Sequence, residues 1–152
     1  EAVAQLNYAL TLVLQRGTAH ASRLANRGLA GKTGTSDDFR DSWFAGFDAT
    51  HLAVVWVGYD DNRDSKLTGS AGALQVWDAL MMALHPTPIP LPVPTGFELQ
   101  TIDYATGTLT RSDCGEPGAE PVTVPIPYNA PLPAGPGCGT SLMERFRQWF
   151  SD

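Results

Sequence analysis

Leu29-Ala30-Gly31-Lys32-Thr33-Gly34-Thr35 is the stretch from which the fold of this chain can be worked out. It places one ammonium group, two hydroxyls and two glycines within seven residues, at the point where a helical pattern gives way to strand patterns. Such a group of donors, with little side-chain bulk between them, suits the binding of an anionic group.

A phosphate-binding loop is the first alternative for this stretch. That motif requires a glycine five positions before the second glycine, and a helix that continues from the lysine. Asn26 stands where the first glycine should be. Residues 34–38 instead read as a turn, with two acidic residues close to where phosphates would lie. The sequence therefore favours a strand.

As a strand, the stretch has room for a ligand along it. Gly31 and Gly34 carry no side chain, and a strand glycine often marks the close approach of a ligand. Thr33 and Thr35 are two residues apart and point to the same face, whereas Lys32 falls on the opposite face unless strand twist and its length bring the ammonium round the edge. On spacing alone, an ordinary half-buried strand with two glycines is an equal alternative.

The flanking sequence extends the pattern well beyond three residues. In chain order, the matching runs are Arg16-Gly17-Thr18-Ala19, Leu29 to Ser36, Asp41-Ser42-Trp43-Phe44-Ala45-Gly46-Phe47 and Val54-Val55-Trp56-Val57-Gly58. The triplet K-T-G belongs to the signature of penicillin-binding proteins and class A β-lactamases. The ordered set resembles the C-terminal part of the transpeptidase domain in class A penicillin-binding proteins of the Gram-negative B type, bifunctional enzymes that polymerise and cross-link peptidoglycan.

The resemblance implies a role for each polar residue of the strand. Lys32 and Thr35 would be the catalytic residues, with Lys32 keeping the site electropositive beside the active serine. Thr33, Gly34 and Thr35 would bind the substrate, whose carboxylate belongs to a terminal D-alanine or to a β-lactam that mimics it. The backbone N–H of Thr35 would supply half of the oxyanion hole, where one preorganised donor is worth roughly 3 kcal/mol.

The sequence departs from that family at the nucleophile. The S-x-x-K motif is absent, because neither Lys32 nor Lys66 has a serine three positions before it, and the S-x-N triplet is absent as well. We therefore expect the serine, its base and the middle motif to lie upstream of Glu1. This chain would then form one wall of an active site and would be inactive alone.

Composition divides the chain into parts. All 12 prolines follow His85, whereas the periodic apolar segments lie before it. We expect residues 1–85 to be the C-terminal part of the transpeptidase domain, 86–96 to be an extended proline-rich linker, and 97–152 to be a small extension. The predicted fold class is α+β: a partial penicillin-binding/β-lactamase-like transpeptidase fold, with a three-stranded antiparallel meander packed by helices, followed by a β-rich, Pro/Gly-rich extension.

Hydrophobic periodicity assigns the elements. We predict helices over residues 1–16, 71–84 and 141–150, and strands over 29–35, 42–47, 51–59, 97–104, 108–111 and 122–124. Gly69-Ser70 offers the N-cap of the second helix, whose core-facing stripe comprises Leu74, Trp77, Leu80, Met81 and Leu84. Both faces of strand 51–59 are apolar, so we expect both to be covered.

Charge and histidine spacing exclude several kinds of partner. The formal net charge is -6 and the basic residues are dispersed, which argues against nucleic acid and anionic lipid. No apolar run approaches the roughly 18 residues of a membrane span. His20, His51 and His85 have no ligand at metal-site spacing, and the acidic loop at 60–64 lacks the glycine and glutamate of a calcium loop. We expect no metal and no other cofactor.

Cys114 and Cys138 lie in the Pro/Gly-rich tail, as two free thiols or as one disulfide. The weakly apolar surroundings favour the disulfide, which would stabilise such a segment by about 3 kcal/mol and would imply an oxidising compartment. The resemblance implies the periplasmic side of the inner membrane, with the anchor outside this chain. The implied partners are peptidoglycan stem peptides, β-lactams, the upstream remainder of the transpeptidase domain and periplasmic regulators.

Two other functions stay open. A class A β-lactamase shares K-T-G but hydrolyses its acyl-enzyme, and such enzymes usually end soon after the helix equivalent to residues 71–84. The long tail argues against it. The other function is a non-catalytic interaction module formed by residues 97–152.

Overall fold

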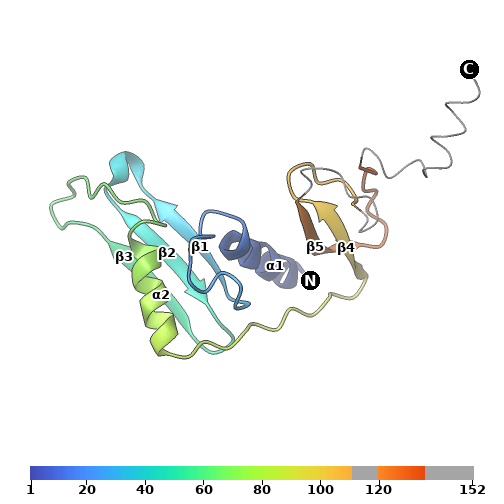
Figure 1. Cartoon of the computed structure of the whole chain (residues 1–152), viewed down its shortest axis with the longest axis horizontal. Helices are drawn as coiled ribbons and strands as arrows, with labels where there is room; N and C mark the ends of the chain where they lie inside the picture. The colour runs from blue at the N-terminus through green and yellow to red at the C-terminus, as the bar shows by residue number, and fades with distance from the viewer. Residues whose placement is uncertain (111–119, 136–152) are drawn as a thin grey trace, which may run out of the picture. The chain divides into compact units, whose positions relative to one another are not determined.

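The structure is a computed structural model that describes residues 1–110 and 120–135. Its elements in chain order are α1 (Ala2–Gln15), β1 (Ala30–Thr35), η1 (Asp37–Phe39), β2 (Ser42–Phe47), β3 (Leu52–Val57), α2 (Ala73–Ala83), β4 (Phe97–Asp103) and β5 (Pro121–Pro127) (Figure 1). The chain divides into two compact units, Glu1–Pro92 and a second that begins at Val93. The division falls inside the proline-rich stretch 86–96.

The first unit contains the predicted antiparallel meander. Its sheet has the order β1-β2-β3, with Thr33 opposite Phe44 and Trp43 opposite Trp56. Short connections between consecutive strands favour this antiparallel arrangement. The expected α+β class and the three-stranded meander packed by helices are confirmed.

The core lies on the face of the sheet that α2 covers (Figure 1). The rings of Phe44 and Trp77 pack with centroids 4.8 Å apart, and Leu14, Leu74 and Met81 are fully buried around them. Other members of this core are Ala19, Leu24, Leu29 and Ala73, with Ala53, Val55 and Val57 packed against it. The core therefore joins both helices and the connector between α1 and β1 to one side of the meander.

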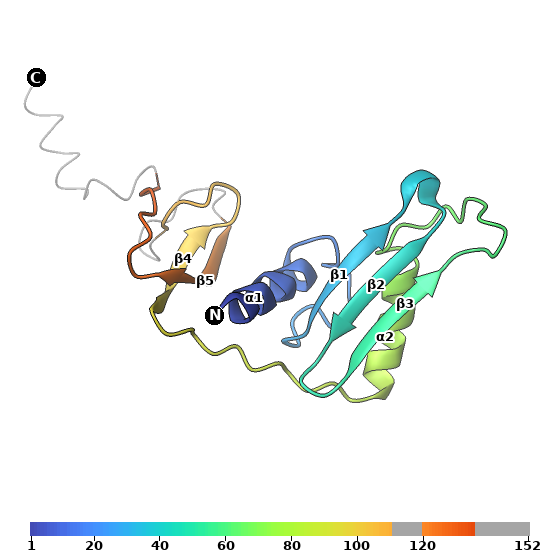
Figure 2. The same cartoon turned by 180° about the vertical axis from the view of Figure 1, so that it is seen from behind.

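The opposite face of the sheet is open, so the expectation that both faces of strand 51–59 are covered is wrong for the described residues. Leu52, Val54 and Trp56 are 74%, 56% and 42% exposed. Alternate residues of a strand point to opposite faces, and α2 packs only against the face of Val55. Figure 2 shows the sheet from the side away from α2.

Helix α2 is shorter than the helix predicted over residues 71–84, and its first turn is capped differently. It begins at Ala73 with Gly72 as N-cap, and no side-chain cap comes from within the helix turn. The hydroxyl of Ser42 on β2 accepts the Ala73 N–H at 2.9 Å, so the predicted cap at Gly69-Ser70 is wrong. The core-facing stripe is also narrower than predicted, because Leu80 and Leu84 are 42% and 40% exposed.

Helix α1 matches the predicted helix over residues 1–16 and lies beside β1 in both views (Figures 1 and 2). Among the described residues, its second half contributes to the core through Leu14, with Val13 packed against it, and Thr11 is buried nearby in the chain. Val3 and Leu6 in the first half are 71% and 56% exposed. Within the part of the chain that the structure describes, the apolar stripe that predicts this helix is therefore buried mainly over its last turns.

The second unit is built on a two-stranded antiparallel sheet of β4 and β5, with Thr101 opposite Thr123. The strand predicted at 108–111 is wrong, because its described part forms only isolated bridges at Leu109. The strand predicted at 122–124 is longer than expected and runs from Pro121 to Pro127.

The prolines of β5 explain why the sequence underestimates this strand. The Tyr104 N–H donates to the Glu120 carbonyl and the Tyr128 N–H to that of Gly96, so even-numbered residues direct their backbone groups toward β4. The prolines at 121, 125 and 127 fall at the outward positions. There a missing N–H costs no ladder hydrogen bond. The predictions for Cys114, Cys138 and helix 141–150 lie outside the described residues.

Candidate functional site

Strand β1 is an edge strand of its sheet, since among the described strands it pairs with β2 alone. The Ser36 N–H donates to the Asp41 carbonyl at 3.1 Å, which continues the ladder toward β2. Because neighbouring residues direct their backbone groups to opposite sides, those of Thr33 and Thr35 face away from β2. We call this side, with the backbone groups of Thr33 and Thr35, the free edge.

The ammonium of Lys32 reaches the free edge. Its side chain starts on the sheet face of Ala45, the residue opposite it on β2. It then bends round the strand, so that Nζ donates to the Thr33 carbonyl at 2.9 Å and to Thr33 Oγ1 at 3.3 Å. None of the ion pairs found in residues 1–110 and 120–135 involves Lys32. Its charge is therefore available to an anionic ligand at this edge.

The hydroxyls of Thr33 and Thr35 lie on the helix-covered face but meet different neighbours. Thr33 Oγ1 is 2.7 Å from Thr18 Oγ1, in the turn that follows α1. Thr35 Oγ1 accepts the Gly69 N–H at 3.0 Å, from the segment that leads into α2. A hydroxyl that accepts a hydrogen bond keeps its own proton for another partner. Thr35 can therefore still donate to a ligand.

The two glycines of the strand have different surroundings. A Cβ on Gly31 would lie 2.6 Å from the ring of Phe44, so this glycine makes room for the core rather than for a ligand. A Cβ on Gly34 would lie 3.1 Å from Trp43 Cβ, on the open face of the sheet. Gly69 must also be a glycine, because a Cβ there would meet the carbonyl oxygens of Gly34 and Trp43 at 2.6 Å. This contact brings the segment before α2 directly onto β1.

Asp41, which directly precedes β2, is a residue to which sequence reasoning assigns no role. Its carboxylate accepts the Trp56 Nε1–H at 2.8 Å, and the hydrogen bonds from Trp56 and then Ser36 hold the pKa of Asp41 below its ordinary value. The rings of Trp56 and Trp43 lie 6.2 Å apart on the open face. The position of Asp41 in the run Asp41-Ser42-Trp43 is the only sequence signal for it.

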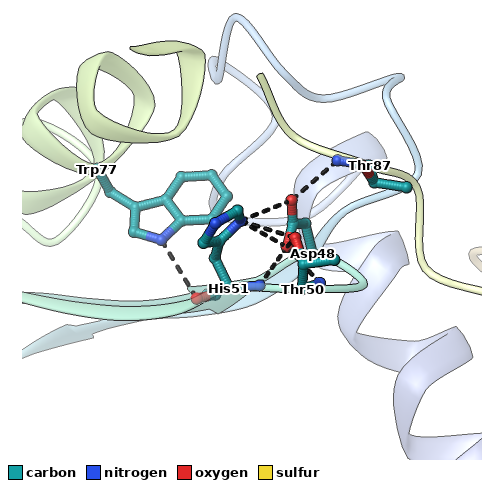
Figure 3. A network of polar contacts seen from close by, with 6 residues as sticks. Asp48, Thr50, His51, Trp77 and Thr87 are labelled. Atoms are coloured by element: carbon teal, nitrogen blue, oxygen red, sulfur yellow. Dashed lines mark hydrogen bonds and ion pairs between the residues drawn. The ribbon is translucent and has the colours of Figure 1, made fainter. Parts of the chain in front are cut away.

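A second polar network lies at the other end of the sheet (Figure 3). The buried carboxylate of Asp48 accepts N–H groups from Thr50 at 2.7 Å, from Thr87 at 2.8 Å and from His51. Burial on its own would raise the pKa of Asp48, but these backbone donors and the His51 ring outweigh it and hold the pKa well below its ordinary value. The network joins the β2–β3 turn to the start of the proline-rich stretch.

Ile89 adds to this attachment, since its N–H donates to the Gly28 carbonyl at 2.9 Å and its side chain is only 8% exposed.

Within the described residues, no group of three or more His, Cys, Asp or Glu side chains could hold a metal ion. In the same part of the chain, no helix is long and apolar enough to cross a bilayer.

Comparison with known protein families gives no match. Among curated proteins, penicillin-binding protein 1B of Vibrio cholerae is 40% identical over 103 residues, which cover 66% of this chain and 13% of that protein. Penicillin-binding protein 1B of Haemophilus influenzae is 46% identical over 79 residues, or 51% of this chain and 10% of its own length. Penicillin-binding protein 1A of Rickettsia bellii is 38% identical over 112 residues, or 71% of this chain and 14% of its own.

A solved structure is similar as well. The crystal structure of penicillin-binding protein 1A from Haemophilus influenzae aligns with a TM-score of 0.60 and 26% identity. The alignment covers 85% of this chain and 20% of that protein chain. This chain thus spans about a tenth to a fifth of the proteins that it matches.

Proposed function

Since this chain is homologous to penicillin-binding proteins 1A and 1B over about half to 70% of its length, we propose that it forms part of a peptidoglycan D,D-transpeptidase. The parent protein would also carry a glycosyltransferase and would act on the periplasmic side of the inner membrane. This chain would contribute the K-T-G strand to the transpeptidase site, and the serine would come from the preceding part of the parent.

The free edge of β1 supports this proposal through its shape. An extended peptide can add to a strand edge by backbone hydrogen bonds, with side-chain groups providing specificity. The stem peptide would lie along the groups of Thr33 and Thr35 that face away from β2. Its terminal carboxylate would then meet the Lys32 ammonium and the hydroxyls of Thr33 and Thr35.

The reaction needs a donor where negative charge develops. A serine oxygen would attack the carbonyl of the penultimate D-alanine, the peptide bond to the last D-alanine would break, and that D-alanine would leave with a proton on its amine. An amine of a neighbouring stem would then resolve the acyl-enzyme. The N–H of Thr35 faces the free edge, as a donor for the carbonyl oxygen in the transition state must.

One observation carries the proposal: the Lys32 ammonium turns round β1 to lie 2.9 Å from the Thr33 carbonyl and 3.3 Å from its hydroxyl. This contact gathers a positive charge and a hydroxyl at one strand edge. An anionic peptide end finds both there without any need for the strand to move.

Covalent labelling by a fluorescent penicillin tests the proposal. We expect the complete protein that contains this chain to be labelled stoichiometrically, and the isolated 152-residue chain to remain unlabelled because it has no S-x-x-K serine. Prior treatment with unlabelled penicillin is the control for specific labelling. A stoichiometric adduct on the isolated chain would contradict the assignment of the nucleophile to another part, and an unlabelled complete protein would contradict the function itself.

A further inference from the structure

Thr18 and Thr33 form a pair of hydroxyls next to the free edge of β1, where they can affect ligand recognition. Thr18 follows α1 and is distant in sequence from the K-T-G strand, yet its Oγ1 lies 2.7 Å from Thr33 Oγ1. Thr18 is exposed at this position, so packing of its methyl group in the core does not explain its place.

The turn after α1 holds Thr18 in position. Gly17 passes so close to the helix that a Cβ there would lie 2.8 Å from Val13 Cα. On the other side of Thr18, the Ala19 N–H donates to the Val13 carbonyl at 3.1 Å, and Ala19 is fully buried. Thr18 is therefore fixed between two anchored residues, with its hydroxyl directed at β1.

Counting donors and acceptors shows what Thr18 can do. A threonine hydroxyl has one proton to donate and two lone pairs that accept. The Lys32 ammonium can only donate, so its 3.3 Å contact occupies one lone pair of Thr33 Oγ1. If Thr18 donates to the second lone pair, the one proton of Thr33 is left for a ligand.

The opposite arrangement would not serve an anionic ligand. If Thr33 donated to Thr18, its proton would point at the end of α1, and the oxygen would present no donor to a carboxylate. The Thr18 hydroxyl has no other partner among the described residues, so it can rotate to become the donor. Consecutive hydroxyl hydrogen bonds also polarise one another, which strengthens the last of them.

We propose that Thr18 is a positioning residue for carboxylate recognition: with a ligand bound, it donates to Thr33 Oγ1 and directs the Thr33 proton to the ligand carboxylate. The inference rests on the proposed function, because it assumes that this edge receives the carboxylate of a stem peptide or β-lactam. It predicts that loss of the Thr18 hydroxyl slows acylation by ligands that carry a carboxylate and leaves acylation by neutral ligands unchanged.

The test measures acylation of the complete protein by benzylpenicillin and by benzylpenicillin methyl ester. Thr18→Val keeps the shape and removes the hydroxyl, and Thr18→Ser restores a hydroxyl. We expect Thr18→Val to slow acylation by the acid about fivefold, the scale of one lost hydrogen bond, and to leave the rate with the ester unchanged. Thr18→Ser should keep the wild-type ratio of the two rates.

Thr101→Val is the matched control. Thr101 and Thr123 form a comparable exposed hydroxyl pair, 3.2 Å apart, in the second unit. The control should leave both acylation rates at their wild-type values. The acid-to-ester ratio is measured within each variant, so a smaller folded fraction cancels from it, and Thr18→Ala provides a second hydroxyl-free variant with the same expected ratio.

Three outcomes would overturn the inference. Equal slowing with acid and ester would mean that Thr18 only supports the local structure. Unchanged rates in both hydroxyl-free variants would mean that Thr33 is oriented without it. If the wild-type complete protein is not acylated by the acid at all, the proposed function fails, and the role of Thr18 fails with it.

Discussion

Lys32 and Thr33 are neighbours in the chain whose side chains start on opposite faces of β1. They meet because the free edge lets the long lysine side chain pass round the strand to the Thr33 hydroxyl, 3.3 Å away. A central strand would block that path with a paired neighbour. The position of β1 at the edge of the sheet is therefore what brings charge and hydroxyl together.

Thr33→Val in the complete protein should lower the rate of β-lactam acylation about tenfold, because a hydrogen bond to a charged carboxylate is worth more than one between neutral groups. Its thermal unfolding midpoint should hardly move, since both polar partners of the Thr33 side chain, Thr18 and Lys32, are exposed. Stopped-flow acylation and calorimetry measure the two quantities. An unchanged acylation rate would remove Thr33 from the site.

At the scale of elements, α2 depends on a residue of the sheet for its first turn. Ser42 Oγ accepts the Ala73 N–H at 2.9 Å and donates to the Thr68 carbonyl at 2.8 Å, and Ser42 is fully buried. The unpaired N–H groups at a helix start need such an acceptor. One side chain of β2 therefore fixes both the start of α2 and the segment that presses Gly69 against β1.

Ser42→Ala should lower the free energy of unfolding by about 1–3 kcal/mol, because it leaves a buried donor and a buried acceptor without their partner. Urea unfolding of the chain measures this loss. Ser65→Ala is the matched control, since Ser65 Oγ donates to the Phe39 carbonyl at 2.7 Å in an exposed loop. Ser65→Ala should lower the free energy of unfolding by less than about 0.5 kcal/mol. Equal losses for the two variants would contradict the role of burial.

At the scale of the whole molecule, residues 87–92 are part of the first compact unit although proline predicts a linker there. Two hydrogen bonds attach these residues. The Thr87 N–H donates to the Asp48 carboxylate at 2.8 Å, and the Ile89 N–H donates to the Gly28 carbonyl at 2.9 Å. Extended chain has no internal hydrogen bonds, so its N–H groups are available to the sheet turn and to the connector. The Tyr8 hydroxyl also donates to the Leu91 carbonyl at 2.8 Å, and the second unit begins after it, at Val93.

The pH dependence of stability should reveal the Asp48 network. The folded pKa of Asp48 lies below its ordinary value of 3.8, so the stability that it contributes is present above pH 3.8 and is lost as the pH falls through the lower, folded value. The difference in unfolding free energy between wild type and Asp48→Asn should therefore be constant from about pH 8 to 5 and shrink under stronger acid.

Urea unfolding at several pH values measures this difference, and the same pair of variants is compared in a His51→Gln background, which lacks the imidazole beside Asp48. Asp61→Asn is the control, because the Asp61 side chain is 63% exposed. It should show no comparable difference at any pH. In the His51→Gln background, the difference in unfolding free energy between Asp48 and Asp48→Asn should persist from pH 8 to 5. Its loss within that range would contradict the lowered pKa of Asp48.

Local patterns predicted the elements of the first unit well and those of the second unit less well. The residues of Ser42–Phe47 and Leu52–Val57 alternate between the two faces of the sheet, and their burial alternates with them. Such a period of two indicates a strand from local sequence alone. The strand Pro121–Pro127 was underestimated, since proline ordinarily argues against a strand and only the hydrogen-bond register reveals its outward positions. The open face of the meander was missed for a related reason, because a pattern of apolar residues does not say which neighbour covers them.

By itself, the sequence determined the two helices and the meander of the first unit and the relationship to class A penicillin-binding proteins, since these depend on residue type and short-range spacing. Only the tertiary structure decided that Lys32 reaches round an edge, that Thr18 meets Thr33, that Ser42 caps α2 and that Asp48 holds Thr87. The last three contacts join residues 15, 31 and 39 positions apart. A hydroxyl or a carboxylate has several acceptable partners, and the packing of helix on sheet selects among them.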